Sequence, residues 1–130
     1  MKYFSGAATY FATLTLPAPA ARSLLDLGDV REIAEVTVNG KPAGTAWMRP
    51  YRVEVTGLLR PGKNRLEVKV TNLWINAMLG RPKPDYSALH ARFGPRFPDP
   101  KEWDVGRLLP SGLLGPVRLL VSEERGSAVP

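Results

Sequence analysis

The sequence predicts an all-β fold, an antiparallel β-sandwich with one long irregular loop. Apolar and polar residues alternate in several short segments, which puts every second side chain on the same face of a strand. The chain holds 13 prolines and 12 glycines, which favours short elements joined by turns. No stretch of about 12 residues shows the periodicity of a helix. Strands with one polar face are typical of antiparallel sheets.

The strands can be placed in order along the chain. The first covers residues 10–16 and ends at a proline, and a short second strand covers residues 35–38. Asn39 and Gly40 then predict a two-residue hairpin, because both residues tolerate positive φ. A return strand is expected over residues 42–48, and the later strands over residues 51–55, 64–70 and 117–121.

Two turns separate the central strands. Pro61 and Gly62 fit the two central positions of a type II turn, since proline fixes φ and glycine adopts positive φ. Residues 56–59 are too few for a regular helix, and they predict a single helical turn. Short strands at this spacing are typical of a sandwich.

A single domain is predicted for residues 1–122, followed by a flexible C-terminal tail over residues 123–130. Within the domain, residues 76–110 show no clean alternation and contain nine prolines or glycines. A loop of this length in a compact domain is functional, covers a neighbouring surface, or is disordered. It carries aromatic side chains that could pack down as anchors, namely Tyr86, Phe93, Phe97 and Trp103.

Composition excludes several classes of protein. The hydrophobic fraction of 44% and the charged fraction of 23% are ordinary for a globular domain. The absence of cysteine excludes disulfides, cysteine zinc sites and cysteine nucleophiles. No apolar stretch is long enough to cross a membrane, and the first residues lack the pattern of a signal peptide. We therefore expect a cytoplasmic protein as the sequence stands, or a secreted or periplasmic one if it is part of a larger enzyme.

The chain is basic, with a formal net charge of +6 and a calculated isoelectric point near 10.0. The basic residues are scattered among acidic ones, and no run of five or more basic residues occurs. Nucleic acid is therefore not a predicted partner, and neither is a membrane. Binding to anionic polymers through net charge is the weakest interpretation of the sequence.

No catalytic constellation is visible. His90 is the only histidine, and the common hydrolase and nucleotide-binding motifs are absent. Glu54 and Glu67 lie among basic residues on polar strand faces, which predicts solvated cross-strand pairing. Asp26 and Asp29 flank a glycine at a strand end, which indicates turn capping, with structural calcium as the alternative. We predict no catalytic residue, no cofactor and no metal site.

Tryptophans near expected strand ends are the candidate carbohydrate contacts. An indole can stack on the apolar face of a sugar ring, while arginine and asparagine hydrogen-bond its hydroxyls. The predicted carbohydrate-binding residues are Trp47, Arg49, Trp74, Asn76 and, from the long loop, Trp103. For any single tryptophan, a place in the core is the alternative interpretation.

Residues 25–41, with the sequence LDLGDVREIAEVTVNGK, resemble the sugar-binding jelly-roll domain of family 2 glycoside hydrolases. In that pattern a strand containing LDLG leads to an Asn-Gly hairpin. Residues 51–64, YRVEVTGLLRPGKN, are similar to the next segment of the same domains. The resemblance covers residues 8–72 in the order and spacing of strand, hairpin and Pro-Gly turn.

The second half is similar to the terminal domain of bacterial α-L-rhamnosidases of glycoside hydrolase family 106. The similarity lies in residues 72–76, in the long loop and in residues 109–117, and the opening residues 3–10 share it. The chain departs from these relatives after Trp74, and its loop is shorter.

The resemblance implies a galactose-binding-like jelly roll attached to a catalytic barrel that this chain does not contain. The function that it implies is a non-catalytic carbohydrate-binding accessory domain of an α-L-rhamnosidase-like glycoside hydrolase. Its expected partners are a plant or bacterial polysaccharide, rhamnose-containing ones included, and a catalytic glycosidase domain. The alternative is an interaction domain that packs on a catalytic domain or self-associates without binding free sugar.

Overall fold

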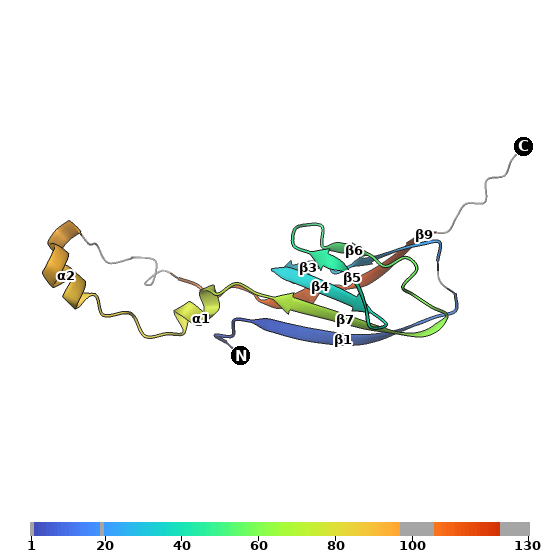
Figure 1. The fold of residues 1–130 in the computed structure, drawn as a ribbon, viewed down its shortest axis with the longest axis horizontal. Coiled ribbons are helices and arrows are strands. Elements are labelled where there is room, and N and C mark those ends of the chain that lie inside the picture. Colours follow the sequence, from blue (N-terminus) through green and yellow to red (C-terminus); the bar gives the residue numbers. More distant parts are fainter. Residues whose placement is uncertain (1, 19, 97–105, 123–130) are drawn as a thin grey trace, which may run out of the picture. The chain divides into compact units, whose positions relative to one another are not determined.

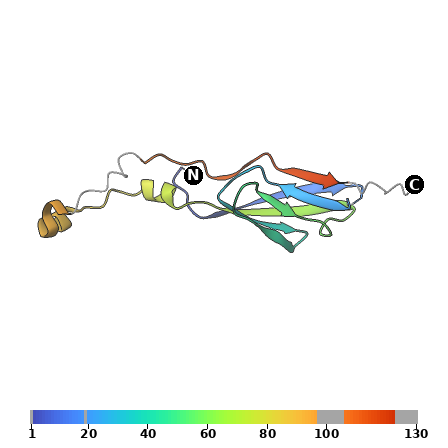
Figure 2. The ribbon, with the colours of Figure 1, turned by 90° about the horizontal axis from the view of Figure 1, so that it is seen from above.

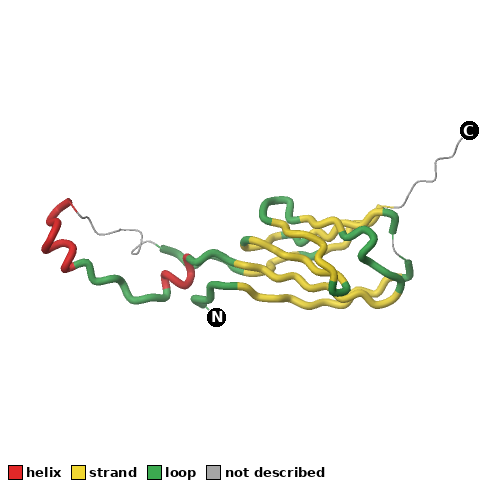
Figure 3. Tube along the Cα trace, viewed as in Figure 1, coloured by secondary structure: helices red, strands yellow, loops and turns green. Residues whose placement is uncertain are grey.

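The computed structural model describes residues 2–18, 20–96 and 106–122, which fall into two compact units (Figures 1 and 3). Of the described residues, the sandwich unit contains 6–18, 20–73 and 110–122. The helical unit contains residues 2–5, 74–96 and 106–109. The predicted tail at residues 123–130 lies outside the described residues.

The sandwich unit confirms the predicted all-β fold. Figures 1 and 2 show its strands running along a common long direction. One sheet has four strands in the order β1 (Ala7–Leu16), β7 (Gly62–Thr71), β4 (Ile33–Val38), β5 (Lys41–Ala46). A second sheet has three strands in the order β6 (Arg52–Glu54), β2 (Arg22–Asp26), β9 (Arg118–Ser122). A two-stranded sheet joins β3 (Asp29–Arg31) to β8 (Gly112–Gly115), and the strand pairs of all three sheets are antiparallel.

The core follows the alternation seen in the sequence. On β4 and β7, every second side chain is buried, and the side chains between them are exposed or half-buried. Leu25 on β2, Leu27 directly after β2 and Val53 on β6 belong to the same buried cluster. Burial of one face of each sheet is the main favourable contribution to such a fold.

The predicted Asn-Gly and Pro-Gly turns are confirmed. Val38 pairs with Lys41 across the hairpin, and Asn39 and Gly40 between them have φ of 52° and 79°. Both values are positive, as a type I′ turn requires. Gly62 has φ of 84°, as the third residue of a type II turn requires, and β7 begins there. The single helical turn predicted for residues 56–59 is not formed. The Leu58 N–H instead donates to the carbonyl of residue 55 at 3.1 Å, and Gly57 between them has φ of 76°, outside the helical region.

The helical unit differs from the irregular loop that the sequence predicts. It contains α1 (Ile75–Leu79), α2 (Ser87–Phe93) and a 3₁₀ turn η1 (Gly94–Arg96). Helices of five and seven residues are too short to display a helical repeat, so periodicity does not reveal them. No helix in the described part of the chain is long and apolar enough to cross a membrane.

Candidate carbohydrate-binding site

A shallow hollow lies where β2 ends and β6 begins. Its volume is about 510 Å³, and the residues that line it are Asp26, Gly28, Asp29, Arg49, Pro50 and Tyr51. The two chain segments are tied together because the Leu27 N–H donates to the Tyr51 carbonyl at 2.8 Å. One wall is therefore the β2–β3 turn, and the other is the β5–β6 connection.

Gly28 shapes the first wall. Its φ is +67°, and a Cβ there would lie 2.5 Å from the Gly115 carbonyl carbon and 2.6 Å from the Pro116 carbonyl oxygen. Only glycine fits such a position without strain or displacement. The Gly28 N–H donates to Asp26 Oδ1 at 3.0 Å. The predicted role of Asp26 in capping this turn is thereby confirmed, and the turn places both aspartates at the hollow.

Both aspartates of the hollow are bonded to arginines. Asp29 Oδ1 accepts from Arg49 Nη2 at 3.0 Å, and Asp29 Oδ2 accepts from Arg31 Nη2 at 3.1 Å. Asp26 Oδ2 accepts from Arg52 Nε at 2.8 Å. Of these charged side chains, Asp26, Asp29 and Arg49 line the hollow.

The pKa of Asp26 lies below the usual value of an aspartate. The Gly28 N–H is the main cause, followed by the hydrogen bond from Arg52, and the positive charge of Arg118 acts in the same direction. Arg118 is the direct neighbour of Asp26 on β9. Asp26 is consequently ionised at neutral pH.

Two of the predicted sugar contacts lie on the β5–β6 connection. Trp47 has 67% of its surface exposed, and the side chain of Arg49 is 68% exposed. Arg49 lines the hollow, and Trp47 is two residues away along the same connection. Trp47 is therefore not a core residue in this structure, so the alternative interpretation does not hold for it.

The other predicted contacts belong to the helical unit or are not described. Trp74 is 60% exposed, and the Arg81 guanidinium lies 5.6 Å from the centre of its ring. Asn76 is buried at 5% exposure, and its amide group donates to and accepts from the backbone of Leu109, both at 2.9 Å. Trp103 lies outside the described residues.

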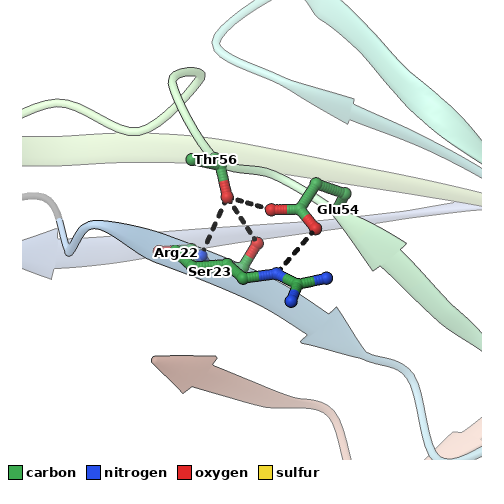
Figure 4. A network of polar contacts seen from close by, with 4 residues as sticks. All are labelled: Arg22, Ser23, Glu54 and Thr56. Atoms are coloured by element: carbon green, nitrogen blue, oxygen red, sulfur yellow. Dashed lines mark hydrogen bonds and ion pairs between the residues drawn. The ribbon is translucent and has the colours of Figure 1, made fainter. Parts of the chain in front are cut away.

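Glu54 belongs to a structural network between β2 and β6 (Figure 4). Its carboxylate accepts hydrogen bonds from the Thr56 hydroxyl and from Arg22 Nε, the latter at 3.3 Å. The Thr56 hydroxyl in turn accepts from the Ser23 N–H at 2.9 Å. These contacts lower the pKa of Glu54, with the Thr56 hydroxyl as the largest cause. The predicted cross-strand pairing of Glu54 is confirmed.

Glu67 differs from the prediction in its partner. It pairs at 3.1 Å with Arg65, which lies two residues away on the same strand rather than on a neighbouring one. Residues two apart on a strand share a face, which explains the pairing. Lys69 instead makes the cross-strand pair, with Glu35 on β4 at 2.7 Å. These carboxylates stabilise the outer face of the sheet.

Within the described ranges, no cluster of three or more His, Cys, Asp or Glu side chains is arranged to hold a metal ion. The carboxylates that could have joined a calcium site, Asp26 and Asp29, have arginine nitrogens as their partners.

Sequence reasoning missed the contribution of Asp26, Asp29 and Tyr51 to the hollow. The turn around Gly28 was visible in the sequence. The sequence did not show that β6 lies beside this turn. Asp26 pairs with Arg52 across β2 and β6, and this pairing joins segments about 25 residues apart. The alternation over residues 51–55 predicted a strand there, but it did not indicate that this strand pairs with β2.

The antiparallel sandwich with a hollow at one end of β2 and β6 defines a galactose-binding-like β-sandwich domain. A family model described as "Glycosyl hydrolase 2 galactose-binding domain-like" matches residues 3–99. The chain belongs to this family, and the predicted resemblance to the sugar-binding domains of family 2 glycoside hydrolases is confirmed.

Two longer proteins named as glycosidases are similar to the chain. A protein of Formosa agariphila named "Putative beta-glucuronidase" is 41% identical over 148 aligned residues, which cover 96% of this chain and 13% of the relative. The solved rhamnosidase from Novosphingobium sp. PP1Y is 35% identical with a TM-score of 0.69, and the match covers 91% of this chain and 11% of the rhamnosidase chain. The chain thus spans a small fraction of the length of either relative.

Proposed function

We propose that this chain is a non-catalytic accessory domain of a glycoside hydrolase and that it binds carbohydrate at the hollow beside Arg49. The observation that supports the proposal is the β5–β6 connection, which presents Trp47 and Arg49 to solvent and lines the hollow. An exposed aromatic ring beside charged hydrogen-bonding groups is the usual composition of a sugar site.

Each side chain has a distinct role in this proposal. Trp47 stacks against the apolar face of a sugar ring and contributes most of the affinity. Arg49 donates hydrogen bonds to hydroxyls, and the carboxylates of Asp26 and Asp29 accept them. Tyr51 is buried, so it forms a rigid part of the lining.

Trp74 and Trp103 are further candidate contacts. Trp74 offers an exposed ring, and Arg81 lies over that ring within the same unit. Asn76 supports this region by holding residue 109 to α1, since both of its amide atoms are bonded to that backbone.

The proposed ligand is a polysaccharide of plant or bacterial origin, with rhamnose-containing chains first among the candidates. The similarity to the Novosphingobium rhamnosidase supports this choice. The proposed partner is a catalytic glycosidase domain, because relatives of this family are much longer than the chain. In this proposal the partner domain catalyses hydrolysis, and this domain binds the carbohydrate.

Calorimetric titration with a rhamnose-containing pectin fragment tests the proposal. We expect saturable binding with a Kd of about 1 mM, because a small sugar offers few atoms. Trp47→Ala should abolish binding while the circular dichroism spectrum stays unchanged. Arg65→Gln, on β7, is the matched control and should bind as the parent does. Absence of heat with the fragment, with L-rhamnose and with D-galactose would contradict the proposal.

A second candidate function is docking on a catalytic domain without sugar binding. Large apolar side chains are exposed on several elements of the sandwich unit, among them Phe11 at 61% and Met48 at 57%. Exposed apolar surface of this kind marks interaction sites. Size-exclusion chromatography over a concentration series distinguishes the two functions, because a docking domain without its partner self-associates, and a sugar-binding module remains monomeric.

A further inference from the structure

The tip of the β4–β5 hairpin holds a reactive pair of residues that the proposed function does not use. Asn39 is followed directly by Gly40, and this is the only Asn-Gly pair in the sequence. Asn39 is half-buried, whereas Gly40 is exposed, and a Cβ at Gly40 would meet nothing within 4 Å. Because glycine has no side chain, its backbone nitrogen is the least hindered from attacking the amide carbon of the preceding asparagine. Asn39 is therefore the asparagine most open to deamidation by its own backbone.

Deamidation at this pair needs water as its only other reactant. The Gly40 nitrogen forms a bond to the Asn39 Cγ and gives up its proton, while Nδ2 leaves as ammonia, and a five-membered succinimide ring closes. Water then opens the ring at either of its two carbonyl groups. One product is an aspartate at position 39, and the other is an isoaspartate, in which the main chain runs through the former side chain.

The folded chain holds the Asn39 side chain by three hydrogen bonds. Nδ2 donates to the Leu58 carbonyl at 3.0 Å and to Asn64 Oδ1 at 2.8 Å, so both of its protons are engaged. Oδ1 accepts from the Arg65 N–H at 2.9 Å. A nitrogen that leaves as ammonia must first lose both of its acceptors, so the bonds of Nδ2 oppose the reaction.

The backbone of the turn also opposes ring closure. Closure requires the Gly40 nitrogen to eclipse the Asn39 Cβ about the Cα–C bond, which is the arrangement, with ψ of about −120°, of the first central residue in a type II′ turn. The positive φ of both residues, 52° and 79°, instead defines a type I′ turn, in which ψ of the first central residue is about 30°. The hairpin must consequently open before the ring forms.

We propose that Asn39 is a latent deamidation site, which is protected while the hairpin is closed and is modified when the hairpin opens. The product does not fit the folded contacts. An ionised carboxylate has no proton to donate, so its oxygens would face the Leu58 carbonyl and Asn64 Oδ1. Acceptors that lose their donor in this way cost free energy. Modification thus destabilises the closed hairpin and favours further opening.

The test incubates the full chain in mildly alkaline buffer with and without denaturing urea. Peptide mass spectrometry locates each exchange of an amide nitrogen for oxygen. We expect modification of Asn39 to be at least about tenfold faster in urea, because a closed hairpin is open for only a small fraction of the time. Equal rates with and without urea would overturn the protection. Absence of modification at Asn39 in urea would overturn the site itself.

The other asparagines are internal controls. Asn64, Asn72 and Asn76 precede residues that carry side chains, so they should react more slowly than Asn39 in urea. Gly40→Ala should likewise slow the modification of Asn39 in urea, because the added methyl group hinders the backbone nitrogen. An unchanged rate in this variant would show that the Gly40 nitrogen is not the attacking group.

A second variant tests the fit of the product. Asn39→Asp reproduces one product, and we expect it to unfold at a lower urea concentration than the parent. Lys41→Gln lowers the net charge by the same amount at an exposed position of the same hairpin, so it is the matched control and should unfold as the parent does. Equal midpoints for the two variants would contradict the destabilisation by the product.

Discussion

Gly28 connects the geometry of the hollow to the packing of the sandwich unit. Its backbone lies so close to Gly115 that the two residues form an isolated β-bridge. Asp26 and Asp29 lie on either side of it, so the position of both carboxylates depends on a residue without a side chain. A side chain at this point would force the turn away from the end of β8.

Replacement of Gly28 by alanine should therefore destabilise the fold strongly. Gly40→Ala is the matched control, because Gly40 also has positive φ, +79°, but a Cβ there would meet nothing within 4 Å. We expect the control to cost about 1 kcal/mol from backbone strain alone, and Gly28→Ala to cost about 3 kcal/mol or more. Urea unfolding measures both, and equal costs would contradict the close approach.

Asn64 is a buried polar residue whose side-chain amide is fully hydrogen-bonded. It is fully buried, its Nδ2 donates to the carbonyls of Arg60 and Gly62, and its Oδ1 accepts from the Arg60 N–H and from Asn39 Nδ2. All four hydrogen-bonding positions of the amide are thus occupied, which a buried asparagine requires.

Asn64→Ala should lower the free energy of unfolding by about 3 kcal/mol, because it leaves several backbone groups without partners. Lys63→Ala, at the exposed neighbouring position, should change it by less than about 0.5 kcal/mol. Chemical denaturation of both variants checks the expectation, and similar midpoints for the two would contradict a structural role of the amide.

Because the pKa of Asp26 is lowered in the folded state, we expect the free energy of unfolding to depend on pH. A carboxyl whose pKa is lower in the folded than in the unfolded state stabilises the fold above the unfolded pKa, and the stabilisation disappears as the pH falls through the folded pKa. The unfolding free energies of the parent and of Asp26→Asn should therefore differ most near neutral pH and converge below about pH 4. A gap that stays constant from neutral to acidic pH would show that the Asp26 charge does not stabilise the fold.

At the scale of elements, the strands with regular alternation could be predicted from the sequence and several others could not. β4, and β7 from residue 66 onward, bury apolar side chains at every second position, so the alternation of these strands was visible in the sequence. β2 was harder to predict from alternation, because one of its two buried side chains is that of Ser23 rather than an apolar one. β3 and β8 have three and four residues, which is too short for a period to show.

The candidate site was predictable only in part for the same reason. Trp47 and Arg49 are neighbours in sequence and could be named together. The contribution of Asp26 and Asp29 depends on the pairing of β2 with β6, which no local pattern encodes. Tertiary pairing, rather than residue type, decides which polar side chains meet at the hollow.

Asn76 gives an element-scale prediction for the helical unit. Because its amide bonds both backbone groups of Leu109, the Leu109 N–H should exchange slowly with solvent. Asn76→Ala should remove this protection, while Trp74→Ala, at an exposed neighbouring position, should leave it unchanged. Amide hydrogen exchange followed by NMR reports both, and persistent protection of Leu109 in Asn76→Ala would contradict the contact.

At the scale of the whole molecule, the chain combines a basic net charge of +6 with a hollow that is lined by charged side chains of both signs. It spans 13% of the Formosa relative and 11% of the rhamnosidase chain. The small share of each relative is what we expect of the proposed accessory domain of a larger enzyme. Its affinity alone would be weak, and attachment to a catalytic domain would raise the effective concentration of the substrate.

The most direct test of this account is the map of amide and indole NMR shifts of ¹⁵N-labelled protein titrated with a rhamnose-containing pectin fragment. The account predicts saturable shifts at residues 26–29 and 49–52 and at the Trp47 indole, with the outer face of β7 unchanged. A well-dispersed spectrum in which these signals stay in place at the highest sugar concentration would contradict it.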